Sequence, residues 1–356
     1  MSDASITPLI DFADRIVTMA KQGGATVAEC IVRQGAELSA RVRMGETELV
    51  EEAGHRSAGL RVMKGKQVAL TSTSDMSDRG IERFVKDALE LVELAQEDPF
   101  AGPADPKLLC DPSKQPDLDL YDPQCGTVDA AQAIEWAKRA EDAAREDKRI
   151  VNSQGSTFGR TTGGFGMALS SGFKAGYTGS YASLYVQPMA EEPDGKKRRG
   201  YHWTARRYLS ELDSAESVGH EAARRTVRLL GSKTVPTTEA AVVFDPDAAR
   251  SILGLLAECI SGGSIWRKSS YLVGREGTRI ASDLVNVVDD PLIPRAPGSR
   301  PFDGEGLASR KNVVVEKGIL KTYLCDSYAA RKLGRESTGS ASRSSGGGVG
   351  GGTTNF

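Results

Sequence analysis

Histidine and cysteine are both scarce in this chain of 356 residues. Its three histidines are His55, His202 and His220. A catalytic zinc site takes three protein ligands, and because so few histidines are present one is disfavoured. The five cysteines are odd in number and never form a CxxC pair. We therefore expect scattered, reduced thiols instead of a disulfide framework or a zinc ribbon.

Long apolar runs are also missing, and none reaches the length of a membrane span. The opening residues, MSDASITPL, lack the basic flank and apolar core of a signal peptide. The formal net charge is -2, whereas a dedicated nucleic-acid binder usually has a strong basic excess. We expect a cytoplasmic protein that acts on neither membranes nor nucleic acids.

Apolar periodicity predicts three structural units, because the chain is long for one core. The first unit, residues 1–110, contains a helix over 9–20, strands over 27–32, 37–44, 57–63 and 67–72, and a helix over 81–92. Prolines then accumulate, and we predict a linker over 111–125. The middle unit, 126–238, is predicted as α+β, with helices over 128–147 and 213–230 and strands over 150–157, 164–174, 176–189 and 201–210.

The third unit, 239–356, is predicted to be rich in β-structure around one main helix. A strand over 239–244 leads into a helix that Asp245 caps and Pro246 begins. A hairpin over 312–324 and a short helix over 326–333 follow. The main helix has one apolar stripe, which we expect to be buried: Ile252, Leu255, Leu256 and Ile260.

A glycine pair follows this main helix, and we expect Gly262 and Gly263 to end it. Trp266, Arg267 and Lys268 then place a large apolar group beside two cations. On residue chemistry alone, a glycine cap with an exposed basic turn is the simplest interpretation. A loop that holds an anion is the functional alternative.

Paired carboxylates occur in PFDGEG, at Asp303 and Glu305. Such a pair can bind a cation or hold basic side chains. Because several arginines lie close in the sequence, a structural ion-pair cluster is favoured over a metal site.

Two further motifs favour structural interpretations. His220-Glu221 would need a second histidine one turn later, but Arg224 and Arg225 stand there, so a solvated helix is favoured. The glycine run 346–352 lacks the Lys-Ser/Thr pair of a phosphate loop.

Five separated blocks resemble, in the same order, the PmbA (TldE) branch of the TldD/PmbA family. They are SAGLRVMKGKQVALTSTSD at 57–75, ISGGSIWRKSSYL at 260–272, PFDGEG at 301–306, KGIL at 317–320 and SYAARKLGRESTG at 327–339. The resemblance implies a multi-domain α+β fold, with helices packed on antiparallel sheets and a β-rich C-terminal domain. Residues 340–355, a flexible tail by composition, resemble the family's glycine-rich stretch before further strands, as in a member lacking its last segment.

The zinc-bearing subunits of this family carry an H-E-x-x-x-H motif. Its counterpart here is the segment Ala257 to Gly262, which keeps Glu258 but has no histidine. The resemblance therefore implies no catalytic residue, metal ligand or cofactor in this chain, with zinc held by a TldD-like partner. We predict that a peptide chamber or an interface is formed by Glu258, Ser261, Gly262, Gly263, Ser264, Trp266, Arg267, Lys268, Asp303 and Glu305.

The leading hypothesis is a PmbA/TldE-type subunit of a cytoplasmic zinc metalloprotease complex that processes small or unfolded peptides. The alternative is a non-enzymatic homodimer that binds peptides or regulates a partner, such as DNA gyrase or an RNA regulator. An autonomous hydrolase using Glu258 or Cys259 is disfavoured, because no nearby histidine could activate a thiol.

Overall fold

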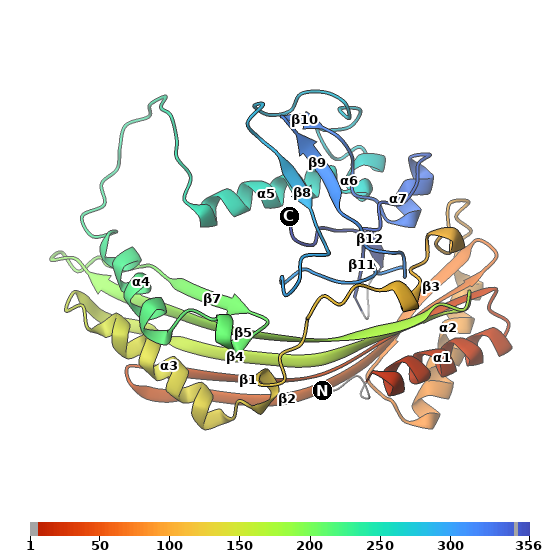
Figure 1. The fold of residues 1–356 in the computed structure, drawn as a ribbon, viewed down its shortest axis with the longest axis horizontal. Helices are drawn as coiled ribbons and strands as arrows, with labels where there is room; N and C mark the ends of the chain where they lie inside the picture. The colour runs from red at the N-terminus through yellow and green to blue at the C-terminus, as the bar shows by residue number, and fades with distance from the viewer. Residues whose placement is uncertain (1–5, 345–347) are drawn as a thin grey trace.

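A long, curved antiparallel sheet of seven strands dominates the computed structural model, which describes residues 6–344 and 348–356 (Figure 1). The strand order is β3-β2-β1-β4-β5-β6, and β7 also pairs with β5. The strands are β1 (Val27–Arg43), β2 (Glu46–Lys64), β3 (Gln67–Thr73), β4 (Ile150–Leu169), β5 (Lys174–Glu191), β6 (Lys197–Arg199) and β7 (His202–Arg206). The predicted α+β class with antiparallel sheets is confirmed.

Several strands are longer than predicted and continue through glycines. β1 runs without interruption through Gly35, and β4 runs through Gly163. These two glycines face each other across the β1–β4 pair. A Cβ on Gly35 would lie 2.7 Å from the His55 ring, so glycine here permits close packing. The residues 27–32 and 37–44 are in a strand as predicted, but in one strand, β1, and 150–157 joins the first part of 164–174 in β4. Only the predicted separations were wrong.

The first two predicted units share this sheet. β1 pairs with β4 from Glu29 to Val42, which joins the unit 1–110 to the unit 126–238. The segment between them, 95–129, carries three short 3-10 helices, at Pro106–Leu108, Pro112–Lys114 and Cys125–Thr127. The predicted boundaries at 111–125 and 238 stay predictions.

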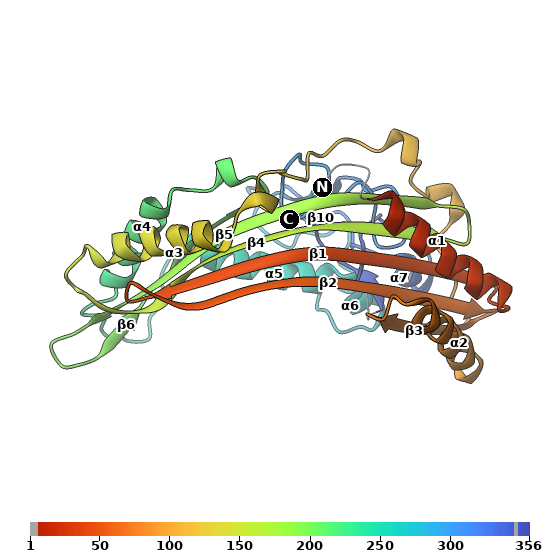
Figure 2. The ribbon, with the colours of Figure 1, turned by 90° about the horizontal axis from the view of Figure 1, so that it is seen from below.

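Four helices cover the convex face of the sheet (Figure 2). They are α1 (Thr7–Gln22), α2 (Asp78–Leu94), α3 (Ala130–Arg145) and α4 (Ala215–Val227). At one end, α1 and α2 bury Cys30 and Val32 of β1. At the other end, α3 and α4 bury Leu38 and Ala40. These β1 positions are all even-numbered, as expected for one face of a strand.

The C-terminal unit lies on the concave face (Figure 1). Ile31 and Phe165 of the sheet contribute to one core with Phe302, whose ring meets that of Tyr177 edge-on at 5.5 Å. The elements of this unit are α5 (Pro246–Ile260), α6 (Gly262–Trp266), β8 (Val287–Asp289), β9 (Asn312–Glu316), β10 (Ile319–Leu320), α7 (Ser327–Lys332), β11 (Ala341–Arg343) and β12 (Val349–Gly351). The predicted hairpin and short helix correspond to β9–β10 and α7.

Two predictions about the start of this unit were wrong. Residues 239–244 form no strand, and the side chain of Val243 is 97 % exposed. No described strand lies beside them to accept their backbone hydrogen bonds, so apolar composition alone does not produce a strand. On α5, Ile260 is buried but Leu255 is 64 % exposed, so the apolar stripe is largely uncovered.

The glycine-rich C-terminal stretch is partly ordered as the β11–β12 hairpin. Within the run 346–352, residues 346 and 347 lie outside the described residues. None of the described helices is long and apolar enough to cross a membrane.

Candidate functional site

The main helix ends beside the glycine pair, as predicted, but the pair begins a second, short helix instead of a turn. α5 ends at Ile260, and α6 starts at Gly262. The Gly262 N–H donates to the Leu324 carbonyl at 2.7 Å. A Cβ on Gly262 would lie 2.8 Å from both the Ala329 Cβ and the Cys325 Sγ. Gly262 is therefore needed for close contact with Ala329 of α7 and with Cys325, in the segment just before that helix.

The residues after this pair divide into a packed part and an exposed part. The half-buried Trp266 meets Tyr328 edge-on, with ring centroids 5.8 Å apart. Arg267 and Lys268 are exposed, and the Arg267 guanidinium lies 5.3 Å from the Trp266 ring centroid. Trp266 thus anchors a segment that presents two cations to solvent.

The other predicted residues of this segment differ in exposure. Glu258 is exposed, and the remaining three are half-buried: Ser261, Gly263 and Ser264. Their role in a peptide chamber or an interface stays a prediction.

Asp303 and Glu305 lie in a buried turn on the concave side of the sheet and are 1 % and 2 % exposed. One Asp303 oxygen accepts the N–H groups of Glu305 and Leu307 at 2.9 and 3.0 Å. Its other oxygen accepts the Ala341 N–H at 3.0 Å. Asp303 therefore holds the turn and joins it to β11.

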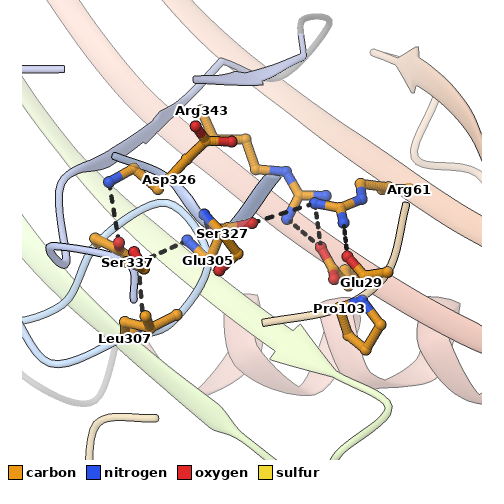
Figure 3. Close-up of polar contacts among 12 residues, drawn as sticks. Glu29, Arg61, Pro103, Glu305, Leu307, Asp326, Ser327, Ser337 and Arg343 are labelled. Carbon is orange, nitrogen blue, oxygen red and sulfur yellow. Dashed lines mark hydrogen bonds and ion pairs between the residues drawn. The ribbon is translucent and has the colours of Figure 1, made fainter. Parts of the chain in front are cut away.

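Glu305 reaches a buried ionic cluster that joins the sheet to the C-terminal unit (Figure 3). We use this name for Glu29, Arg61, Glu305 and Arg343. Arg61 lies 3.4 Å from Glu29 and 3.7 Å from Glu305, measured between side-chain nitrogen and oxygen. Arg343 donates to Glu29 at 2.9 Å. Two arginines thus balance two carboxylates at the junction.

Sequence reasoning found Glu305 but missed Glu29, Arg61 and Arg343. Glu29 and Arg343 are 314 residues apart in the chain, so no local pattern could pair them. The available signal was a charged residue inside an apolar strand, such as Arg61 within LRVM. A buried charge requires a partner, although the sequence does not say which one.

Burial, together with the nearby Asp303 carboxylate, raises the pKa of Glu305 to about 7, although Arg61 opposes the shift. Burial also raises the pKa of Asp303. In the same cluster, burial lowers the pKa of Arg343 against the opposing charge of Glu29. The junction therefore contains a carboxyl group that titrates near neutral pH.

Glu305→Gln is expected to reduce the pH dependence of stability between about pH 5 and 7. In the folded protein Glu305 keeps its proton up to about pH 7, whereas its ordinary pKa is 4.5. Folding therefore binds a proton in this window, and stability falls as the pH rises through it. A difference of this size corresponds to about 3 kcal/mol.

Urea unfolding at pH 5 and pH 8 would measure this effect. The exposed Glu82 on α2 provides the matched control, and Glu82→Gln should leave the pH slope unchanged. An unchanged slope in Glu305→Gln would show that this carboxyl group is not the titrating one.

A cavity of about 330 Å³ lies beside the buried ionic cluster and is lined in part by Arg61, Glu305, Asp326 and Arg331. The segment 98–104 borders it, and its carbonyl groups accept hydrogen bonds from basic side chains. Arg331 donates to Phe100, Gly102 and Pro103. Arg61 also donates to Gly102, at 2.8 Å. Arg61 and Arg331 therefore hold the backbone of the segment 98–104 through hydrogen bonds to its carbonyl groups.

A metal ion does not fit the residues present. Within residues 6–344 and 348–356, no three or more His, Cys, Asp or Glu side chains gather closely enough to hold one. Glu258 is exposed, and neither Ala257 before it nor Gly262 four residues later has a side chain that can bind a metal. His220 instead contacts Glu146 at 2.9 Å, on the exposed surface.

Comparison with known proteins identifies the family. Three family models match in order: PmbA/TldA metallopeptidase domain 1 at 28–92, the central domain at 123–230 and the C-terminal domain at 237–356. The chain is 37% identical over 320 residues to Metalloprotease PmbA of Escherichia coli O157:H7, covering 90% of this chain and 70% of that protein. This chain belongs to the PmbA/TldD family.

Other PmbA/TldD relatives agree. The chain is 36% identical to the PmbA homologue of Haemophilus influenzae, covering 91% of this chain and 71% of that protein. A crystal structure from Bacteroides thetaiotaomicron, described as a candidate modulator of DNA gyrase, superposes with a TM-score of 0.87 at 26% identity, covering 92% of this chain and 74% of that one. TldE of Thermococcus kodakarensis shares the fold, with a TM-score of 0.81, 21% identity and coverage of 96% and 76%.

Proposed function

We propose that this PmbA-type chain is the zinc-free subunit of a cytoplasmic peptidase complex, with the metal held by a TldD-like partner. The observation that carries the proposal is that the segment Ala257 to Gly262, which we take as the counterpart of the family's zinc motif, contains Glu258 but no histidine. Glu258 alone cannot hold zinc, since a catalytic site takes three protein ligands. When bound in the partner, zinc would supply an activated water.

This chain would contribute walls that hold small or unfolded peptides. A hollow with a volume of about 750 Å³ lies on the concave face of the sheet, and no described residue of the C-terminal unit lines it. The hollow is lined by short or polar side chains, including Ser39, Thr161, Tyr181 and Ser183. These side chains can form hydrogen bonds with a peptide whatever its sequence. Such a lining suits a site that binds varied peptides.

Co-expression with a TldD-like subunit tests the proposal. The two chains are expected to co-purify, with zinc and peptide cleavage found in the complex and not in this chain alone. Zinc content by mass spectrometry and cleavage of an unfolded peptide would be measured for each chain and for the pair. Stoichiometric zinc and cleavage by this chain alone would overturn it.

Replacing both Arg267 and Lys268 with alanine is expected to weaken complex formation or peptide turnover by about tenfold, a loss of about 1.4 kcal/mol. Both side chains are exposed and stand beside the anchored Trp266, so the change should not disturb folding. Lys197→Ala with Arg199→Ala, an exposed pair on β6, is the control. If both variants match the wild type in assembly and rate, these two residues have no part in the site.

The second candidate is a non-enzymatic homodimer that binds peptides or regulates a partner. The similarity to the Bacteroides thetaiotaomicron protein described as a candidate gyrase modulator favours it. In that case the chain alone should form a dimer and bind peptides, and adding a TldD-like chain should change neither property.

A further inference from the structure

Half of the β2 strand is an unpaired sheet edge. β3 pairs with β2 only between Ala58 and Lys64. From Glu46 to Arg56, β1 is the one strand of the described chain that pairs with it. Figure 2 shows this half of β2 along the border of the sheet. In an antiparallel ladder alternate residues turn their backbone groups outward, so about five residues here present free N–H and C=O groups.

This edge is neither short nor broken by proline, two of the features that usually protect an edge, although it does carry charged side chains. It contains no proline, and its single irregularity lies at its far end, opposite Arg41 and Val42. It also exposes two apolar side chains, Leu49 at 38 % and Val50 at 40 %. A long, regular and partly apolar edge is a template for an added strand.

The charge on the edge indicates what such a strand would carry. Four glutamates lie between residues 46 and 56, at Glu46, Glu48, Glu51 and Glu52, against one arginine, Arg56. Glu52 pairs with Arg160 at 3.2 Å, and Glu48 lies within 3.7 Å of Arg41 and Arg43. No ion pair joins Glu46 or Glu51 to another described residue.

The concave hollow adds to this charge, since Val50, Glu51 and Ala53 form one border of it and the exposed Glu37 also lines it. A strand added along β2 would point alternate side chains toward this hollow. Lysine or arginine at those positions would meet Glu51 and Glu37. A second copy of this chain would instead bring another acidic edge against this one.

We propose that the β2 edge from Glu46 to Arg56 captures an extended peptide with basic side chains by strand addition. The inference rests on the proposed function, because it names the substrate class that the peptidase complex would admit. Backbone hydrogen bonds would supply affinity that does not depend on sequence, and Glu46 and Glu51 would select for positive charge.

Fluorescence anisotropy with labelled ten-residue peptides would test the proposal on the full chain. The probe alternates lysine and valine, and the comparison peptides replace lysine with glutamate or carry N-methyl groups on alternate backbone nitrogens. We expect the glutamate and N-methylated peptides to bind at least tenfold more weakly. Equal binding of the N-methylated peptide would overturn strand addition.

Hydrogen exchange and a charge variant locate the binding. Amides between 46 and 56 should exchange more slowly when the probe is bound. Glu46→Lys with Glu51→Lys should weaken the probe at least tenfold, whereas Glu82→Lys with Glu97→Lys, at exposed sites elsewhere, should not. The proposal would be overturned if the probe left hydrogen exchange at residues 46–56 unchanged. It would also be overturned if these amides were protected without peptide, in a dimer that forms as the protein concentration rises.

Cleavage assays separate this inference from the proposed function. If the Glu46→Lys, Glu51→Lys variant assembles with a TldD-like subunit and cleaves basic peptides at the wild-type rate, the β2 site is wrong and the peptidase role stands. If the edge binds the probe but no partner-dependent cleavage occurs, the peptidase role fails and the capture site stands.

Discussion

Replacing Arg343 with methionine is expected to lower the free energy of unfolding by about 3–5 kcal/mol. Arg343 is 6 % exposed and donates to Glu29 at 2.9 Å. Methionine fills similar space but removes the charge, and Glu29 then keeps only Arg61, at 3.4 Å. A buried carboxylate with a weaker partner is costly. Urea unfolding at pH 7 would measure the loss.

Two further variants make this result specific. Glu29→Gln in the Arg343→Met background should recover part of the loss, because the uncompensated charge is gone. Arg139→Met breaks an exposed pair with Glu216 and should cost less than about 1 kcal/mol. If Arg343→Met also costs less than about 1 kcal/mol, the buried ionic cluster contributes little to holding the C-terminal unit on the sheet.

Replacing Gly219 with valine is expected to destabilise the protein by about 3 kcal/mol. Gly219 lies in α4 where that helix meets α3. A Cβ there would lie 2.2 Å from the Ala140 carbonyl oxygen and 2.9 Å from the Ala144 nitrogen. Because both are backbone atoms, no side-chain rotation relieves the collision, and the helices must separate. Thermal unfolding followed by circular dichroism would measure the change.

Gly254 in α5 is the contrasting position. Apart from the neighbouring backbone of its own helix, no described atom lies within 4 Å of a Cβ built there, so Gly254→Ala should stabilise the helix by about 0.5–1 kcal/mol. If Gly219→Val and Gly254→Ala have the same effect, close packing of α3 and α4 does not govern stability. Opposite signs would show that neighbouring backbone, and not helix propensity, decides which glycines are required.

The sequence predicted those elements that depend on neighbouring residues. Asp245 does cap α5, since its side chain accepts the Asp247 N–H. The β9–β10 hairpin turns at Lys317 and Gly318, both with positive φ, as expected for a tight turn. The family resemblance, which depends on blocks of adjacent residues, was confirmed by comparison.

Predictions failed where partners distant in the chain decide the outcome. The apolar residues 240–244 suggested a strand, but a strand needs a neighbour for its hydrogen bonds, and none lies beside them in the described structure. The glycine pair correctly marked the end of α5, but the sequence did not show that Gly262 is required by the close approach of Cys325 and Ala329. The apolar stripe of α5 correctly predicted a helix. The prediction that the stripe is buried was wrong for most of its length.

By itself the sequence determined the α+β class, the family, most helix positions and the absence of histidines around Glu258. Each of these is a property of composition or of residues close together in the chain. Only the tertiary structure decided that β1 pairs with β4, that Glu29 meets Arg343, and that Glu46 to Arg56 is left as an open edge. These depend on which surfaces exclude water together, and residues far apart in the chain carry no local record of that choice.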